Sequence, residues 1–293
     1  MKLNRKQILS IVLIVLIVSV VVGWIAWGNK ALVVSTYTVS DSEIPAAFSG
    51  FQIAHISDLH NDEFGENNEK LVALLEDLKP DMIAITGDLI DYYDTDMDIS
   101  LEFVAHIVQI APCYYVPGNH EARIDGYDQF KVELEQIGVH VLENGSAVLE
   151  RDGETITLLG VKDPAFLSKI FFPDLRKNST EEDNIIMNLM LRELCKNNEG
   201  YEILLSHRPD QMEVYANYNL DLVLSGHKHG AQFRLPYLGG LFTPSDGFFP
   251  KYDAGLYEQD HTTMIVSRGL GNSTFPFRIN NRPEVLIIEL RSK

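Results

Sequence analysis

Five stretches of this chain end in residue types that bind metal ions, and each follows a short apolar run. The most compact one runs from Tyr114 to Glu121, where a Pro-Gly turn leads into Asn119 and His120. The other four are Ile53–His60, Met82–Asp91, Glu202–His207 and Asp221–His229. Open α/β sheets place their chemistry outside the carboxyl ends of strands, so we expect these side chains to converge.

The donors in these stretches are Asp58, His60, Asp88, Asn119, His120, His207, His227 and His229. Carboxylate, imidazole and amide ligands without thiolates suit Mn, Fe, Zn or Mg rather than a structural zinc site. There are too many donors for one ion, which favours two divalent ions about 3.5–4 Å apart, bridged by a carboxylate. Such a pair activates a bridging water as hydroxide for attack on a phosphoryl group, and an imidazole outside the ligand set can protonate the leaving alkoxide.

Any one of these residues, taken alone, is explained equally well as a hydrogen-bonded polar group at a strand end or as a metal ligand. A lone Asp-x-His pattern is expected about once by chance in a chain this long. The five stretches together, each directly after an apolar run, are what predicts a site.

The segments between these motifs predict the elements that position them. The predicted strands include 51–56, 82–85, 113–116, 202–205 and 220–224, and the predicted helices are 67–78, 100–110, 128–137 and 184–196. In the first half, strands alternate with helices, which predicts a parallel sheet covered by helices. After residue 139 short strands dominate, and residues 163–183 are predicted to form a polar loop. We expect one α/β domain of two facing sheets with helices outside.

The segment Ile8–Trp27 is uncharged, rich in Ile, Val and Leu, and long enough to span a bilayer. Trp24 and Trp27 stand at its far end, where aromatic rings favour the membrane interface. A cleaved signal peptide is the alternative, but the run lacks a small-x-small cleavage site. The sequence therefore predicts a retained transmembrane helix.

Three cations, Lys2, Arg5 and Lys6, precede the span, whereas Lys30 is the only early cation after it. The positive-inside rule then puts the N-terminus in the cytoplasm. We predict a cytoplasmic N-terminus and anchor over residues 1–30 and a catalytic domain over 31–293, held at the cell membrane on the extracytoplasmic side.

The composition argues against nucleic acid as a partner and leaves open whether the two cysteines form a disulfide. The chain has 293 residues and a formal net charge of −18, which argues against a nucleic-acid-binding surface. Cys113 and Cys195 are the only cysteines; they could pair outside the cell, although Cys113 lies in an apolar run typical of a core.

The full motif set resembles that of the calcineurin-like metallophosphoesterases, from about Phe51 to the C-terminus. It comprises Asp58-Leu59-His60, Gly87-Asp88-Leu89-Ile90-Asp91, Gly118-Asn119-His120-Glu121, His207 and Gly226-His227-Lys228-His229. The stretches Leu204–Pro209 and Ser267–Gly271 resemble the family's bacterial membrane-attached branch, which is related to UDP-2,3-diacylglucosamine diphosphatases. The resemblance implies a four-layer α/β/β/α sandwich.

The resemblance also implies roles for individual residues. Asp58, His60, Asp88 and His229 would hold the first metal ion, and Asp88, Asn119, His207 and His227 the second. His120 would be the acid at the leaving group, with Asp91 as its partner. Apart from the resemblance, Arg123 and Arg208 stand close to motif ends and are candidates to bind phosphate oxygens, with surface salt bridges as an equal alternative, and Lys228 brings a cation to the rim of the site as a further candidate substrate residue. Relatives often have Thr in place of Lys228 and Gly in place of Ala231, so substrate preference is expected to differ.

These observations predict a membrane-anchored dinuclear-metal phosphoesterase. One alternative is hydrolysis of a lipid-linked pyrophosphate in glycolipid biosynthesis, and another is a metal-bound receptor without turnover. In the predicted polar loop, Phe166-Leu167 and Ile170-Phe171-Phe172 are apolar. They mark either a membrane or ligand contact, or a part of the core that tucks under the loop.

Overall fold

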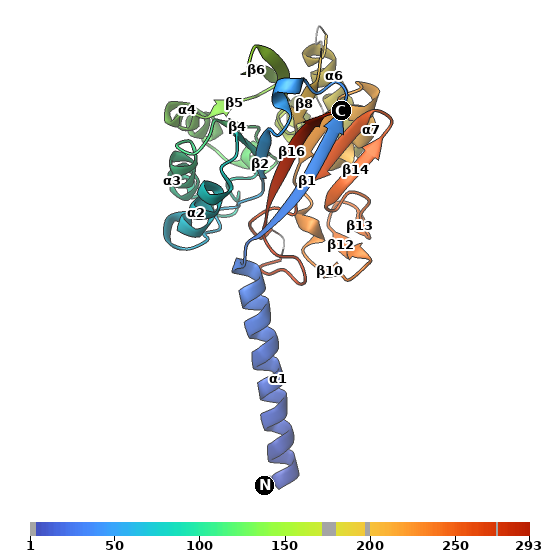
Figure 1. Ribbon diagram of the computed structural model, residues 1–293. Coiled ribbons are helices and arrows are strands. Elements are labelled where there is room, and N and C mark those ends of the chain that lie inside the picture. Colours follow the sequence, from blue (N-terminus) through green and yellow to red (C-terminus); the bar gives the residue numbers. More distant parts are fainter. Residues whose placement is uncertain (1–3, 172–179, 197–199, 274) are drawn as a thin grey trace.

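The structure is a computed structural model that describes residues 4–171, 180–196, 200–273 and 275–293. Its first element, α1 (Arg5–Lys30), projects from the domain as one long helix (Figure 1). Of the helices in these ranges, α1 is the one long and apolar enough to cross a membrane. None of its residues is buried against the domain. A helix of this length with exposed apolar side chains is typical of a membrane-spanning segment, whose side chains contact lipid.

The first sheet has six strands in the order β1-β16-β2-β3-β4-β5. They are β1 (Val33–Asp41), β16 (Glu284–Ser292), β2 (Gln52–Ile56), β3 (Met82–Ile85), β4 (Cys113–Tyr115) and β5 (His140–Val141). Strands β2 to β5 are parallel, and β16 runs antiparallel to β2. Helices α2 (Glu69–Leu78), α3 (Met97–Ile107) and α4 (Tyr127–Ile137) bury their apolar faces against the outer side of this sheet.

The second sheet also has six strands, in the order β14-β15-β9-β8-β7-β6. They are β14 (Gly255–Gln259), β15 (Thr262–Val266), β9 (Leu222–Ser225), β8 (Glu202–Leu205), β7 (Glu154–Gly160) and β6 (Gly145–Arg151). The helices α6 (Thr180–Leu194) and α7 (Met212–Asn217) pack on its outer side through a separate apolar cluster.

The two sheets face each other across a shared core. Ile53 and Leu286 of the first sheet and Leu158 and Leu224 of the second belong to this core and are fully buried. The central strands β3, β8 and β9 are buried on both faces and read as nearly continuous apolar runs, whereas β1, β6 and β14 at the sheet edges alternate in exposure. The predicted α/β/β/α sandwich with an apolar N-terminal helix is confirmed.

Two short hairpins extend the domain towards α1 (Figure 1). They are formed by β10 (Arg234–Leu235) with β11 (Gly239–Gly240), and by β12 (Phe242–Thr243) with β13 (Gly247–Phe248).

The prediction of a loop over residues 163–183 is wrong, because Ala165–Phe171 form the helix α5. The Asp163 carboxylate accepts a hydrogen bond from the Ala165 backbone N–H at 2.8 Å, which caps the helix start. Phe166 packs edge-on against Tyr127, and Leu167 packs against the core beneath the second sheet. This pair is therefore part of the core rather than a membrane contact. Phe172 and the Phe171 side chain lie outside the described residues.

The two cysteines are free. Cys113 is buried in β4, and Cys195 is half-buried after the end of α6.

Candidate metal centre

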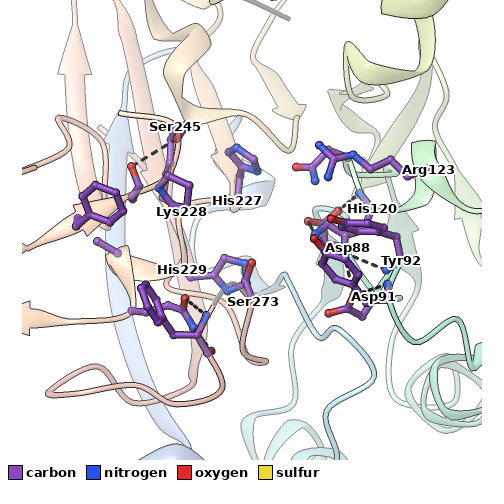
Figure 2. Close-up of a pocket in the computed structure, with 18 residues that line it drawn as sticks. Asp88, Asp91, Tyr92, His120, Arg123, His227, Lys228, His229, Ser245 and Ser273 are labelled. Atoms are coloured by element: carbon purple, nitrogen blue, oxygen red, sulfur yellow. Dashed lines mark hydrogen bonds and ion pairs between the residues drawn. The ribbon is translucent and has the colours of Figure 1, made fainter. Parts of the chain in front are cut away.

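The five motif loops meet because of how the strands that precede them run. β2, β3 and β4 are parallel in one sheet, as are β8 and β9 in the other, so each group delivers its loops at one edge. Figure 2 shows Asp88, His120 and Arg123 on one side of a cavity, and His227 and His229 on the other. The cavity has a volume of about 440 Å³.

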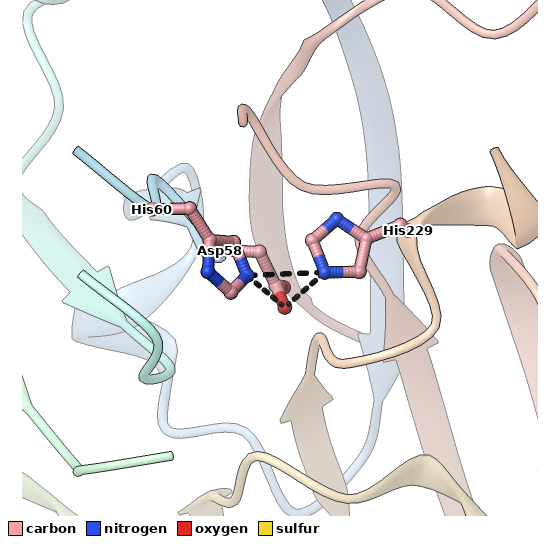
Figure 3. A group of neighbouring side chains, drawn as sticks. All are labelled: Asp58, His60 and His229. Atoms are coloured by element: carbon pink, nitrogen blue, oxygen red, sulfur yellow. Dashed lines mark hydrogen bonds and ion pairs between the residues drawn. The ribbon is translucent and has the colours of Figure 1, made fainter. Parts of the chain in front are cut away.

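The first group of donors comprises Asp58, His60 and His229 (Figure 3). Asp58 Oδ1 lies 3.2 Å from His229 Nε2 and 3.9 Å from His60 Nε2. The Asp58 carboxylate also accepts the His227 backbone N–H at 2.9 Å. All three side chains are buried, so a cation among them would be shielded from water.

The second group comprises Asp88, His207 and His227, with the Asn119 amide beside them. His207 Nε2 lies 3.2 Å from Asp88 Oδ2 and 3.2 Å from Asn119 Oδ1. Asp88 Oδ2 is also 3.7 Å from His60 Nε2, in the first group. Asp88 is thus a buried carboxylate that lies beside both donor groups.

The histidine hydrogen bonds leave metal-binding lone pairs inside the site. His207 Nδ1 donates to the Thr86 carbonyl at 2.7 Å, and His229 Nδ1 donates to the Gly271 carbonyl at 3.2 Å. Each Nε2 atom is then free of hydrogen in the neutral ring. Second-sphere carbonyls commonly orient metal-binding imidazoles in this way.

Facing nitrogens show that the donor set fits divalent cations. His60 Nε2 lies 3.1 Å from His229 Nε2, and His207 Nε2 lies 3.1 Å from His227 Nδ1. Lone pairs at this separation repel each other unless a proton or a cation lies between them. Buried carboxylate, amide and imidazole donors suit the harder divalent metals.

Burial and neighbouring charges set the ionisation of these donors. Burial lowers the pKa of His229 to about 3 and that of His227 well below its ordinary value. Burial alone would raise the pKa of Asp88, but the imidazoles of His207 and His120 hold that pKa well below its usual range. Neutral His227 and His229 and an ionised Asp88 are in the forms that metals bind. Although burial alone would lower the pKa of His207, the Asp88 carboxylate raises that pKa to about 10, so a metal ion bound there would displace a proton.

The backbone of the donor loops is strained. The left-handed region holds Asp58 (φ 54°), His60 (50°), Asp88 (53°), His227 (71°) and His229 (49°). A non-glycine residue there costs about 1–2 kcal/mol. Such strain persists where the surroundings enforce it, and it clusters at functional sites.

His120 lies at the edge of the donor groups. Its Nε2 is 4.0 Å from Asp88 Oδ2, and its Nδ1 accepts the Tyr92 backbone N–H at 3.2 Å. In the neutral ring the hydrogen therefore sits on Nε2, the nitrogen nearer to Asp88. The predicted partner Asp91 is 3.6 Å from His120 Nδ1, and it is also 3.7 Å from His60 Nδ1.

The three predicted substrate residues have different surroundings. Arg123 lines the cavity and stacks on Tyr92, with 4.9 Å between its guanidinium carbon and the ring centre. Lys228 also lines the cavity, but its ammonium lies 2.9 Å from Asp246 and 3.3 Å from Asp210. Arg208 is not among the lining residues.

Arg208 is held in the fold by carboxylates. Its Nε and Nη2 donate to Asp163 at 2.6 and 3.1 Å, and Asp183 lies 3.7 Å away. A bidentate pair of this kind occupies the same fork of donors that a phosphate would need. The structure therefore favours a structural role for Arg208.

Glu121 has a positioning role that the sequence analysis did not assign. Its buried carboxylate accepts backbone N–H groups of Asp88 at 2.9 Å, Gly118 at 2.7 Å and Ile90 at 3.3 Å. It therefore ties the loop after β3 to the loop after β4. No local signal marks this role, because Glu121 stands among polar and charged residues, with Asn119 and His120 before it and Arg123 after it.

Comparisons with known proteins agree with this geometry. The sequence model of the calcineurin-like phosphoesterases matches residues 51–231. The metallophosphoesterase YkuE of Bacillus subtilis, itself uncharacterized, is 32% identical over 263 residues, covering 87% of this chain and 84% of its own length. Phosphodiesterase YaeI of Escherichia coli is 27% identical over 246 residues, covering 82% of each chain.

Two further relatives bear on the anchor and the fold. A zebrafish transmembrane protein with a metallophosphoesterase domain is 28% identical over 261 residues, covering 85% of this chain and 55% of its own. The crystal structure of TT1561 from Thermus thermophilus superposes with a TM-score of 0.51 at 17% identity, covering 75% of this chain and 89% of its own, which is a likeness of fold.

Proposed function

The chain belongs to the calcineurin-like phosphoesterase family and is a metal-dependent phosphoester hydrolase, and we propose that it works with two divalent ions at a membrane surface. The observation that carries this proposal is the position of Asp88 beside both donor groups, 3.2 Å from His207 and 3.7 Å from His60. A single buried carboxylate between two sets of imidazoles suits a bridging ligand.

In this proposal Asp58, His60 and His229 would hold one ion, Asn119, His207 and His227 would hold the other, and Asp88 would serve both. When bound, such ions supply Lewis acidity at the phosphoryl oxygens and an activated water. The protein fixes the positions of these donors before substrate binds. The strained loops fix the backbone, and hydrogen bonds to buried carbonyls, such as that of His207 Nδ1 to Thr86, orient the imidazoles.

Two side chains are proposed to act on the substrate directly. His120 lines the cavity and carries its hydrogen on Nε2, from which it can donate a hydrogen bond or a proton to the leaving oxygen. Arg123 lies over the Tyr92 ring in the cavity wall, from which its guanidinium can bind a phosphate oxygen. Lys228 contributes less charge, since Asp210 and Asp246 neutralise it.

We further propose that the anchor comprises residues 1–30 and that the catalytic domain, 31–293, lies on the extracytoplasmic side of the cell membrane. The cations before the apolar span support this orientation.

A lipid-linked phosphoester or pyrophosphate is a second candidate substrate, supported by an apolar collar of exposed residues. The collar consists of Leu235, Tyr237, Leu238, Phe248, Phe249, Phe275 and Phe277, which are 36% to 107% exposed. Its hairpins lie at the end of the domain from which α1 leaves (Figure 1). Phe275 also lines the metal-site cavity, so the collar adjoins the proposed active site.

Turnover by the full-length protein, purified and supplied with Mn²⁺, tests the main proposal. We expect hydrolysis of at least one substrate among nitrophenyl phosphate, bis(nitrophenyl) phosphate and inorganic pyrophosphate. The Asp88→Asn variant is the matched negative control. If the protein binds two ions and hydrolyses none of these or any lipid phosphoester, the receptor alternative replaces the enzyme.

The lipid-linked candidate needs a separate comparison of two matched variants. Leu238 in the collar and Val148 on β6 are both 66% exposed, but β6 lies at the far end of the domain from α1 (Figure 1). We expect Leu238→Ser to slow hydrolysis of a phosphoester in vesicles while sparing a soluble diester, and Val148→Ser to affect neither. Equal effects of the two variants on the vesicle substrate would refute a membrane role for the collar.

A further inference from the structure

A second cavity, which we call the juxtamembrane pocket, lies where α1 meets the domain. It has a volume of about 290 Å³. Trp24 and Trp27 of α1 form one wall, and Arg268, Arg278 and Arg282 contribute to the opposite wall. Both tryptophans belong to the last turns of the apolar span, at the depth where lipid headgroups begin.

The helix end is fixed against this part of the domain by specific contacts. The Asn29 side chain accepts the Arg278 backbone N–H at 2.8 Å and donates to the Arg278 carbonyl at 3.3 Å. Arg282 donates to the carbonyls of Ala31 and Leu32 at 2.8 and 2.6 Å. These bonds hold the two walls of the pocket together at the point where the chain leaves the bilayer.

The pocket concentrates positive charge in a chain whose net charge is −18. Arg268 is paired with Glu284. In the described part of the chain, by contrast, no carboxylate lies within ion-pair distance of Arg278 or Arg282. Arg282 instead stacks on Trp27, with 5.0 Å between its guanidinium carbon and the ring centre.

Arg278 gives stronger evidence than Arg282 that the pocket binds an anion. Its side chain is only 2% exposed, and its Nη1 donates to the Arg268 carbonyl at 2.8 Å. Its Nε–H is buried and has no hydrogen-bond partner among the described residues. A buried guanidinium N–H that has no acceptor is costly, so an anion that accepted it would stabilise this arrangement.

Arg278 also approaches the metal centre, since its Nη2 donates to the Gly271 carbonyl, which accepts the His229 Nδ1–H as well. A role confined to orienting His229 would account for Arg278 alone. It would not account for Arg282, whose bonds are to Ala31 and Leu32, or for the two tryptophans on the opposite wall.

We propose that the juxtamembrane pocket binds the phosphate of an anionic glycerophospholipid headgroup. The guanidinium groups of Arg278 and Arg282 contact the phosphate oxygens. Trp24 and Trp27 pack against the glycerol and the first methylenes of the acyl chains. This assignment does not rest on the proposed catalytic activity, and it concerns a cavity separate from the metal site.

Tryptophan fluorescence tests the proposal at the pocket itself, because Trp24 and Trp27 are the only tryptophans in the chain. The full-length protein is reconstituted in phosphatidylcholine vesicles. A small fraction of the lipid is brominated phosphatidylglycerol in one sample and brominated phosphatidylcholine in the other. Bromine quenches indole on contact. We expect phosphatidylglycerol to be enriched at the tryptophans by about fivefold or more, as one to two basic residues imply.

The matched variants are Arg282→Gln in the pocket and Arg291→Gln near the end of β16, at the opposite end of the domain from α1 (Figure 1). Arg282→Gln should abolish the preference for phosphatidylglycerol, and Arg291→Gln should keep it. The preference should persist in about 1 M salt, where the Debye length of about 3 Å screens mere surface attraction.

Three outcomes would overturn the proposal. Equal quenching by the two brominated lipids in the wild-type protein would show that the pocket selects no headgroup. Loss of the preference on adding millimolar inorganic phosphate would identify a free-anion site instead. A preference that disappears in high salt would reflect surface charge alone.

Discussion

Gly226 begins the loop that carries His227 and His229, and replacing it with alanine should disturb the first donor group. A Cβ atom at Gly226 would lie 1.9 Å from Ser57 Oγ and 2.3 Å from Asp58 Oδ2. The Ser57 hydroxyl can rotate away. The Asp58 carboxylate is fully buried and bonded to the His227 backbone N–H at 2.9 Å, so it cannot turn towards solvent.

The size of the effect follows from this distance. Real Cβ contacts shorter than 3.0 Å essentially never occur, so either Asp58 or the histidine loop must shift by about 0.7 Å. A misplacement of about 1 Å at an active site costs about 10²-fold in rate. We therefore expect Gly226→Ala to lower kcat/KM by about 10- to 100-fold. The overpacking should also lower the free energy of unfolding by about 1–3 kcal/mol.

The assay compares Mn²⁺ affinity by calorimetric titration with kcat/KM on whichever substrate the wild-type protein hydrolyses. Gly145→Ala is the matched control, because a Cβ there meets nothing within 4 Å. Gly226→Ala should weaken Mn²⁺ binding and turnover, while Gly145→Ala should change neither. If Gly226→Ala binds and turns over like the wild-type protein, the donor group is not rigidly placed and the reasoning fails.

Three other predictions concern the metals, the acid and the topology. Asp88→Asn should lose bound metal and activity together, and metal analysis that still finds two ions at full occupancy would contradict the bridging role. His120→Ala should keep both ions but lower turnover of an alkyl phosphoester by about 10²–10⁴-fold, with a smaller loss for a nitrophenolate leaving group, which needs no proton. A reporter fused after Lys293 should be active only outside the cytoplasm; cytoplasmic activity would reverse the proposed orientation.

The strands and the gathering of the donors were predictable because both depend on local pattern. Each buried strand is a run of apolar residues, and its metal-binding residues follow at once, so parallel pairing alone brings Asp58 and Asp88 to one edge. The helix α5 was missed because it has only 7 residues, too few to show a helical period, and its start depends on a cap from Asp163. The ion pair of Arg208 could not be predicted for a related reason: its partner Asp163 is 45 residues away, and no local pattern reveals that pair.

The collar and the juxtamembrane pocket could not be predicted from the sequence, because both depend on tertiary packing. Tyr237 and Leu238 lie in a short Gly-rich stretch with no clear periodicity, so their exposure is set only by tertiary packing. Arg278 reads as an ordinary surface residue until the fold buries it beside the end of α1.

The pairing of β1 with β16 has a consequence for how the protein is made. β1 follows the anchor almost immediately, yet it lies at the edge of its sheet, where its neighbour is β16, with Val33 opposite Glu284. During synthesis the anchor enters the membrane early, while β1 must wait for some 250 residues before its neighbour is made. An unpaired strand of this kind is open to wrong pairing in the meantime. The first sheet can therefore close only late, after the strands between have assembled, and a chain interrupted before Glu284 should leave β1 exposed beside the bilayer as a target for proteases.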